Sequence, residues 1–372
     1  MTKEQKLIWD LPTRVFHWML VLSFAGAWLA FDDDRYLYIH VYSGYVLLAL
    51  LIFRLLWGVI GSHYARFYSF AHSWPSATAY IKALLTGQAA RYVGHNPAGS
   101  WAIFLMLLLG FAVTLTGMFT LGGEERHGLF VGLMSIGTGF VFHEIHEVLA
   151  WTMLVVVAVH LVGVIVESLY HRENLIMAMF TGHKEGGGDD GVHVRPWSVV
   201  AVVLMSAIVA SSFFTFRGYL GQTEQHPFLP FAGIVLPDND TWREECGDCH
   251  MAYHPSLLPA RSWVKLMDEQ HDHFGDDLDL DDDDKAEITD FLVQNSAEYL
   301  LVEPSWRILT ETPANETPMR VTETHYWKRK HAEIEQRYWD SKKVMSKGNC
   351  PACHLDARAG TYEDADMHLP HL

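Results

Sequence analysis

Cysteine is scarce in this sequence, with only four residues in a chain of 372. All four fall in two runs of the form Cys-x-x-Cys-His, which are Cys246-Gly-Asp-Cys249-His250 and Cys350-Pro-Ala-Cys353-His354. No cysteine lies outside these two runs, and the chain cannot hold an extended disulfide framework. The few thiols therefore point to two short motifs in the C-terminal part of the chain.

The spacing of these motifs suits covalent haem attachment. Two thiols three positions apart can add across the two vinyl groups of one haem, and the next histidine can reach the iron. A lone Cys-x-x-Cys is also typical of redox motifs or half of a zinc site, but a histidine follows both pairs here. We predict two haem c groups, one on Cys246 and Cys249 and one on Cys350 and Cys353, with His250 and His354 as iron ligands.

Basic residues are also few, and the charge is unevenly placed. Residues 1–217 hold 13 Lys and Arg against 14 Asp and Glu, whereas residues 218–372 hold 14 against 30. The first part is nearly neutral and apolar, and the second is strongly acidic. An acidic domain repels nucleic acid and favours basic partner proteins, although the same charge also keeps a domain soluble.

A signal-peptide cleavage site is lacking as well. The first apolar stretch ends in Asp32-Asp33-Asp34 rather than in small residues, so we interpret it as a retained anchor helix. Membrane crossing needs about 20 apolar residues of helix. The stretches that meet or approach this length are 15–31, 38–60, 100–121, 143–169 and 197–216. We therefore expect five spans, a surface helix near 75–87 and a flexible linker around Gly186-Gly187-Gly188.

The loops between these spans indicate an orientation. Nine Lys and Arg residues lie on the side of the N-terminus and three on the other side, which is a positive-inside bias. The bias places the N-terminus in the cytoplasm and residues 218–372 outside the membrane. Covalent haem is attached outside the bacterial cytoplasmic membrane, so the two lines of reasoning agree.

Four histidines lie at matched depths in the expected spans. His146 and His160 are 14 residues apart on one span, which gives about 21 Å of rise and about 40° of rotation. His40 shares the outer depth with His146, and His17 shares the inner depth with His160. We predict two haem b groups, an outer one between His40 and His146 and an inner one between His17 and His160.

Simpler interpretations exist for each histidine alone. A single histidine in a helical bundle is most simply a hydrogen-bonded polar residue, and His143 competes with His146 for the outer site. We prefer His146, since His143 lies about 100° from the face of His160. Gly44 follows His40 by one turn and leaves room for a porphyrin. Arg54 either pairs with a haem propionate or extends toward the membrane surface.

Residues 8–184 resemble the bacterial nickel-hydrogenase-type membrane b cytochrome family. The stretches that carry the resemblance are Trp9-Asp-Leu-Pro-Thr-Arg-Val-Phe-His-Trp18, His40-Val-Tyr-Ser-Gly44, Gly94-His-Asn-Pro-Ala-Gly99, His143-Glu-Ile-His-Glu147, His160 and Arg172-Glu-Asn-Leu175. The resemblance implies the same four haem ligands. It also implies that electrons move between quinone and a redox partner such as a hydrogenase or an external cytochrome.

Residues 240–372 are similar to the diheme cytochrome c family. Besides the two haem motifs, the resemblance rests on Leu258-Pro-Ala-Arg-Ser-Trp263, His273-Phe-Gly275 and the stretch from Trp327 to His331. It implies His273 and His331 as the distal ligands. The residues alone leave other ligands open, namely His254, His271, His325, Met251 and Met345.

The acidic run from Asp276 to Asp284 has calcium-loop spacing in part. The sixth loop position is Asp284, however, where a calcium loop needs glycine. We expect the run to open a helix at 285–294, because carboxylates stabilise a helix N-terminus.

Together these features predict an all-α chain in three parts. Residues 1–184 would form a membrane domain with haems in a four-helix core, residues 185–217 a linker and fifth transmembrane helix, and residues 218–372 a mostly α-helical periplasmic dihaem domain. The expected function is electron transfer between quinone and a soluble periplasmic cytochrome or other redox protein, in the bacterial inner membrane. We expect contact with the lipid bilayer, no nucleic acid, and homo-oligomerisation as a further option.

Two rival functions belong to other classes. One is a docking and electron-transfer subunit of a hydrogenase or another reductase. The other is oxidation of superoxide at the outer haem b, for which Arg35 and Arg126 offer little basic surface. Haems with two protein ligands leave no open iron position, which favours an electron carrier. If the chain is an enzyme, a quinol–cytochrome oxidoreductase is expected.

Overall fold

The computed structural model describes residues 5–32, 36–185, 193–223, 226, 228 and 235–372, and it divides into two compact units. The first unit comprises residues 1–32, 39–117 and 143–221. The second comprises residues 33–38, 118–142 and 222–372. The second unit therefore includes the connection between two helices of the first, together with their ends.

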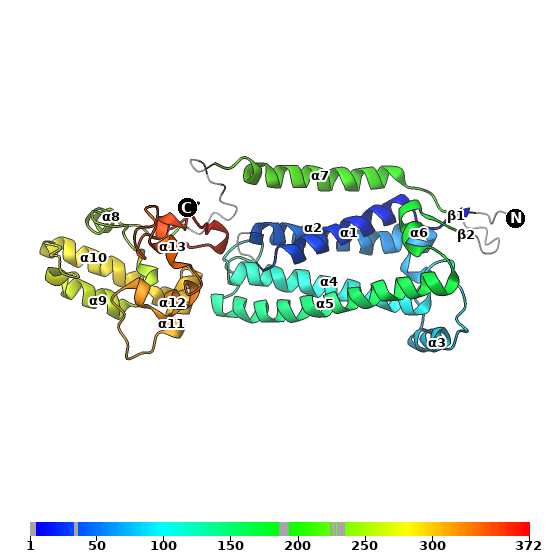
Figure 1. Ribbon diagram of the computed structural model, residues 1–372, viewed down its shortest axis with the longest axis horizontal. Coiled ribbons are helices and arrows are strands. Elements are labelled where there is room, and N and C mark those ends of the chain that lie inside the picture. The colour runs from blue at the N-terminus through cyan, green and yellow to red at the C-terminus, as the bar shows by residue number, and fades with distance from the viewer. Residues whose placement is uncertain (1–4, 33–35, 186–192, 224–225, 227, 229–234) are drawn as a thin grey trace. The chain divides into compact units, whose positions relative to one another are not determined.

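Long helices make up the first unit (Figure 1). They are α1 (Leu11–Leu29), α2 (Leu37–Ile60), α4 (Pro97–Gly123), α5 (Ile136–His171) and α7 (Ser198–Leu220), with the shorter α3 (Trp74–Leu85) and α6 (Leu175–Thr181) and the 3-10 turns His63–Ala65 and Phe67–Ser69. Two short strands, β1 (Gln5–Leu7) and β2 (His183–Glu185), pair antiparallel with Leu7 opposite His183. The predicted surface helix and the predicted spans all appear as helices, within seven residues at either end.

Aromatic and small residues hold the first unit together. Phe16 on α1 lies 6.1 Å from Phe53 on α2, between ring centres, and Trp28 on α1 lies 4.9 Å from Trp151 on α5. Helix α7 packs along α1, and Tyr42 of α2 also bonds to Ser212 of α7 at 2.7 Å. These contacts join α1, α2 and α5 into one bundle with α7 at its side.

Four helices are long and apolar enough to cross a membrane among the described residues, namely α2, α4, α5 and α7. Large apolar side chains such as Val155, Val159 and Val203 are exposed on α5 and α7, which suits contact with lipid rather than water. Helix α1 is less apolar because Arg14 and His17 lie in its first two turns. A fifth span therefore stays a prediction.

Two boundaries differ from those expected. Helix α5 has 36 residues, about 54 Å, and starts seven residues before the predicted span at 143. Lys184, expected at the start of a linker, lies in β2, where its ammonium is 3.5 Å from Glu173. The glycines at 186–188 lie outside the described residues.

Short helices and turns build the second unit. Its α-helices are α8 (Asp240–Glu245), α9 (Ala260–Asp268), α10 (Asp282–Gln294), α11 (Glu303–Glu311), α12 (His325–Lys330) and α13 (Gln336–Trp339). Its 3-10 turns are Pro255–Leu257, Gln270–Asp272, Ala297–Tyr299, Val321–Glu323, Cys350–Ala352 and Asp364–Asp366. A core of buried residues lies between α8, α9 and α10, with Trp242, Trp263 and Ile288 among its members.

The acidic run opens α10 as predicted. Asp281 is the N-cap, and its carboxylate accepts hydrogen bonds from the backbone amides of Asp283 and Asp284 at 3.0 and 2.9 Å. Asp282, Asp283 and Asp284 occupy the first turn, where the helix dipole favours negative charge. The local structure of this run is that of a helix start.

Candidate haem sites

The outer pair of membrane histidines is assembled by four helices. The ring centres of His40 on α2 and His146 on α5 are 5.9 Å apart, with the planes at 79°. The Nδ1 of His40 donates to the carbonyl of Ala27 on α1, and the Nδ1 of His146 donates to that of Val113 on α4, both at 2.9 Å. These bonds fix the tautomer that leaves each Nε2 with a lone pair for a metal.

This spacing can be compared with that of two imidazoles on one iron. A histidine nitrogen binds a metal at about 2 Å, so imidazoles on opposite faces of an iron have ring centres about 6 Å apart. Packed aromatic rings have centres about 4.5–7 Å apart, so the distance alone does not require a metal. The separation of His40 and His146 is compatible with two ligands of one iron.

His146 rather than His143 belongs to this pair. His143 is exposed, whereas the ring of His146 is partly buried against α4. Gly117 of α4 makes room for it, since a Cβ there would lie 2.9 Å from the Cε1 of His146. The choice made on helical angle agrees with this packing.

The inner pair shares only α5 with the outer pair, because its second histidine lies on α1 and not on α2. His17 on α1 interacts electrostatically with His160 on α5, and the buried Nδ1 of His17 has no hydrogen-bond partner among the described residues. Open space adjoins both membrane pairs: a Cβ added at Gly44 or at Gly163 meets no heavy atom within 4 Å. Unpaired ring nitrogens beside open space fit a flat cofactor.

The two histidine pairs of the second unit have the same spacing. His250 and His273 have ring centres 6.3 Å apart, and His331 and His354 are 6.2 Å apart. The Nδ1 of His250 donates to the carbonyl of Met251, and that of His331 to the carbonyl of Trp327, each at 2.8 Å. Nε2 is again the nitrogen left for a metal.

Burial keeps three of these histidines neutral. It lowers the pKa of His273, His331 and His354 below the ordinary value for the side chain. The neutral imidazole is the form that binds a metal. The neutral state of these histidines and the distances between their rings are both compatible with metal binding.

The other ligands that the sequence left open are used elsewhere. Both ring nitrogens of His254 are bonded, to Ser256 and to the carbonyl of Pro237. His271 bonds to Asp277 at 2.9 Å and His325 to Glu316 at 3.1 Å. Met345 is largely exposed, and Met251 meets His250 through its backbone carbonyl. His273 and His331 are the histidines that meet the motif histidines.

All four cysteine thiols are free. Burial raises the pKa of the Cys246 and Cys350 thiols to about 11, so both hold their protons at neutral pH. Neither pair is closed as a disulfide, which leaves two thiols beside each motif histidine. This is the set of groups that covalent attachment of one haem per motif requires.

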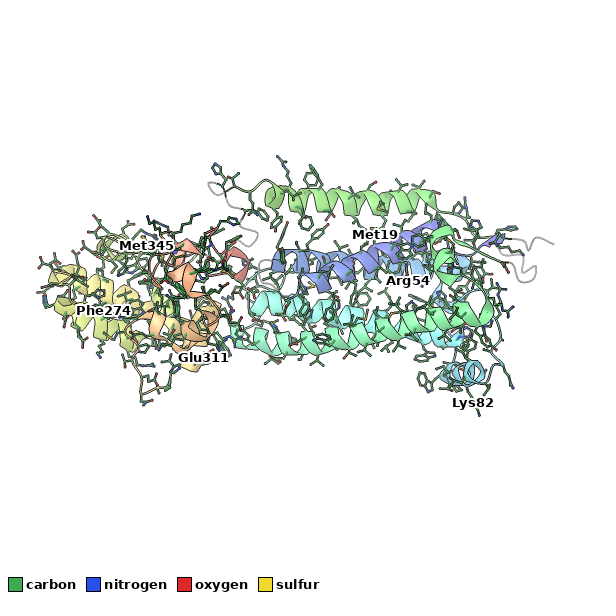
Figure 2. The ribbon with its side chains drawn as sticks, in the orientation of Figure 1. Met19, Arg54, Lys82, Phe274, Glu311 and Met345 are labelled. Carbon is green, nitrogen blue, oxygen red and sulfur yellow. The ribbon has the colours of Figure 1, made fainter. Side chains whose placement is uncertain are left out.

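His95 is packed between aromatic rings and is partly buried. Its ring centre lies 4.6 Å from that of Trp9 and 4.4 Å from that of Phe70. Arg54, labelled in Figure 2, interacts electrostatically with the His95 ring. Its guanidinium donates a hydrogen bond to the carbonyl of Ala65 at 2.9 Å. In the sequence, the only feature that singled out His95 was the glycine-flanked run from Gly94 to Gly99.

Comparison with known proteins separates the same two regions. Residues 8–182 match the family described as prokaryotic cytochrome b561, and residues 242–362 match the family described as dihaem cytochrome c. The chain resembles two cytochrome families, one in each region. Its cytochrome b561 region contains the membrane histidine pairs, and its dihaem cytochrome c region contains both Cys-x-x-Cys-His motifs.

Individual relatives agree with these matches. The probable Ni/Fe-hydrogenase B-type cytochrome subunits of Rhizobium leguminosarum bv. viciae and Bradyrhizobium diazoefficiens are 26% and 28% identical. These matches cover 49% and 48% of this chain and 90% and 85% of the relatives. The solved diheme cytochrome c from Rhodobacter sphaeroides is 38% identical over 34% of this chain and 99% of its own, with a TM-score of 0.30. The two cytochrome families imply b and c haems in an integral membrane protein of electron transfer.

Proposed function

We propose that this protein transfers electrons between the quinone pool and periplasmic redox partners, with two haem b and two haem c groups bound along one chain. The observation that carries the proposal is the recurrence of one geometry. Three histidine pairs have ring centres 5.9, 6.3 and 6.2 Å apart, and the fourth pair, His17 and His160, shares helix α5 with the first. The haems supply one-electron redox chemistry when bound.

The side chains of this protein would hold and tune those groups. His17, His160, His40 and His146 are the proposed ligands of the haem b irons. His250 with His273, and His354 with His331, are those of the haem c irons. Two ligands at each iron leave no position for substrate, so the residues favour electron transfer over catalysis at iron.

We place the protein in the bacterial inner membrane with its N-terminus in the cytoplasm and residues 218–372 in the periplasm. The positive-inside bias and the need to attach haem c outside the cytoplasm both support this orientation. A phosphatase reporter fused after Arg217 should be active, and the same reporter fused near Gly187 should be inactive. The opposite pattern would overturn the orientation.

Stopped-flow reduction by quinol tests the function directly. The full chain in lipid vesicles is mixed with a quinol, and the b and c absorbance bands are followed separately. We expect the b band to be reduced first and the c band to follow. In a His146→Ala variant the c band should stay oxidised with quinol yet be reduced by dithionite. If quinol reduces neither band in the intact protein, quinone is not its substrate.

A second candidate function has its own support. The relatives that match residues 8–182 are named as cytochrome subunits of Ni/Fe-hydrogenases. A chain that docks on a hydrogenase would be purified with that enzyme and be reduced by hydrogen only in the complex. Purification of the tagged chain from membranes followed by a hydrogen-uptake assay separates this candidate from the first.

A further inference from the structure

The two Cys-x-x-Cys-His sites of the second unit have different surroundings. At the first, Cys249 and His250 are exposed, and so is Phe274, which follows the distal His273 (Figure 2). At the second, Cys350, Cys353 and His354 are all partly buried. A redox group held at the first site therefore has an edge open to solvent, whereas one held at the second is more enclosed.

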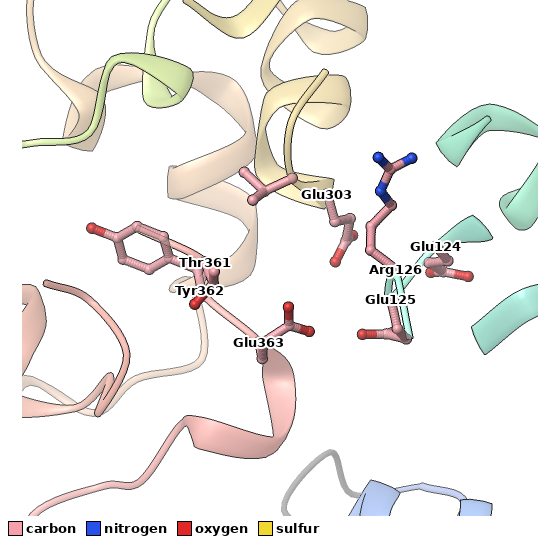
Figure 3. Close-up of a pocket in the computed structure, with 8 residues that line it drawn as sticks. Glu124, Glu125, Arg126, Glu303, Thr361, Tyr362 and Glu363 are labelled. Atoms are coloured by element: carbon pink, nitrogen blue, oxygen red, sulfur yellow. The ribbon is translucent and has the colours of Figure 1, made fainter. Parts of the chain in front are cut away.

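The second site is linked to the connection between α4 and α5. The ring of Tyr362 lies 5.4 Å from that of His354, and Tyr362 and Glu363 line a pocket together with Glu124, Glu125 and Arg126 of the connection (Figure 3). The Nε2 of His127 lies 3.4 Å from a carboxylate oxygen of Glu363. Tyr362 and Glu363 thus link the second site to a segment that joins two helices of the cytochrome b561 region.

Helix α11 adds to this contact. The ring of Trp306 lies 4.4 Å from that of Phe140, and the guanidinium of Arg307 lies 3.8 Å from the centre of the Phe140 ring. Phe140 belongs to α5, the helix in which His146 follows six residues later. The segment that Tyr362 and Glu363 link to the second site therefore continues directly into α5, which contains His146 and His160.

Charge separates the two sites further. Residues 268–284 hold ten carboxylates and no Lys or Arg, and nine of these carboxylates are exposed. This run contains His273 of the first site, and the backbones of His273 and Asp276 exchange two hydrogen bonds. Residues 325–349, around His331, hold seven Lys and Arg against three acids. A basic protein is attracted to the first site and repelled from the second.

We propose that the face around Cys249, His250 and His273 docks a soluble, lysine-rich electron-transfer protein, while the Cys350 to His354 site serves the chain's own membrane region. The inference rests on the proposed function. One electron passes between the first site and the redox group of the partner, so that one is oxidised and the other reduced, and no bond or proton is exchanged. The exposed motif and its carboxylate rim both belong to this docking face.

This order reverses the one that chain position suggests. Cys246 follows α7 by only 26 residues, which favours the first motif as the neighbour of the membrane haems. The contacts of Tyr362, Glu363 and Trp306 instead join the second motif to the α4–α5 connection. Packing takes precedence over tether length, because a tether of this length spans any distance up to several tens of ångströms.

A binding experiment on the full chain tests the proposal without quinone. The probe is an oxidised, lysine-rich monohaem cytochrome c titrated calorimetrically into detergent-solubilised protein at low ionic strength. The test variant carries Asp268→Lys with Asp276→Lys at the first site. The matched control carries Glu333→Lys with Glu335→Lys near the second site. All four side chains are exposed, and both variants change the net charge by the same amount.

We expect the test variant to bind at least tenfold more weakly and the control less than twofold more weakly, with covalent haem content unchanged in both. Binding of the intact chain should weaken steeply as salt is added. Equal weakening in both variants would mean that net charge alone attracts the probe and would overturn the docking face. No change in the test variant, or no binding by the intact chain, would overturn it as well. None of these results depends on quinol reduction. The binding experiment therefore tests the docking face, and the stopped-flow experiment tests the proposed function.

Discussion

The outer histidine pair of the membrane region and the two pairs of the dihaem region have similar ring separations but are positioned in different ways. Regular helices place His40 and His146, and carbonyls from two further helices orient both rings. Short turns place His273 and His331, and the partner of each sits in a Cys-x-x-Cys-His motif. The comparison teaches that a haem site can be defined by helical geometry alone or by covalent attachment with little regular structure.

Chemical extraction should show the largest difference between the two regions. Acid acetone should remove all haem b and leave all haem c, because only the dihaem region has thiols to attach it. The pyridine haemochrome spectrum should give equal amounts of b and c. In a Cys350→Ala with Cys353→Ala variant the covalent haem should fall by half. A ratio other than one to one would contradict the assignment of four histidine pairs.

Removal of one membrane ligand should be the next largest effect. We expect His146→Ala to lose one of two haem b groups, because its ring completes the pair with His40. His143→Ala, three residues away on the same helix and exposed, is the matched control and should keep both. Haem content per chain measures the result. Loss of haem from the control alone would mean that the pairing in α5 has been assigned to the wrong histidine.

A smaller effect is expected at the glycine that faces His146. An added methyl at Gly117 would lie 3.1 Å from the Nδ1 of His146 and would compete with the bond to Val113. Loss of such orienting contacts typically weakens metal-site affinity about tenfold or more. Gly117→Ala should therefore shift the midpoint potential and weaken retention of the outer haem b. Gly163→Ala, near the inner pair, should leave the outer haem unchanged in the same potentiometric titration.

The smallest effect concerns stability of the dihaem region. Burial and the nearby Asp364 raise the pKa of Glu303 from 4.5 to about 7. The protonated form is favoured in the folded state, so its stabilisation is complete below pH 4.5 and is lost as pH rises through 7. A shift of this size corresponds to about 3 kcal/mol.

We therefore expect the thermal midpoint followed at the c absorbance band to fall between pH 5 and pH 8, and Glu303→Gln to flatten the fall. Glu335→Gln, on the exposed surface, should keep the wild-type profile. If the Glu303→Gln variant has the same pH profile as the wild type, Glu303 does not cause the fall in the thermal midpoint.

The membrane sites were more predictable from sequence than the distal ligands of the dihaem region. Fourteen residues of helix fix the angle between His146 and His160, which favoured His146 over His143. In the structure the ring centre of His146 lies 5.9 Å from that of His40. Residue spacing gave no such rule for His273 or His331, because the chain between motif and ligand folds through turns. Only the family resemblance selected them. The bond of His254 to Pro237, which removes that rival, depends on tertiary structure.

Other features lay beyond sequence reasoning for the same reason. Nothing local to His95 showed that Trp9 and Phe70 would enclose it, because the three residues are far apart along the chain. The link between the connection from 118 to 142 and the second motif also comes from contacts between distant segments. Helix lengths, by contrast, followed from apolar run length, and the acidic run was correctly expected to begin a helix.

The pairing of β1 with β2 bears on how such a protein can be assembled from parts. Gln5 lies opposite Glu185, so the two ends of the cytochrome b561 region are joined to each other by a small ribbon. A region whose ends meet can fold and remain closed whatever is attached after it. Helix α7 follows the ribbon and packs on α1, so it belongs to the same unit. A designer who wished to replace the dihaem region would therefore keep α7 and cut the chain after Leu220.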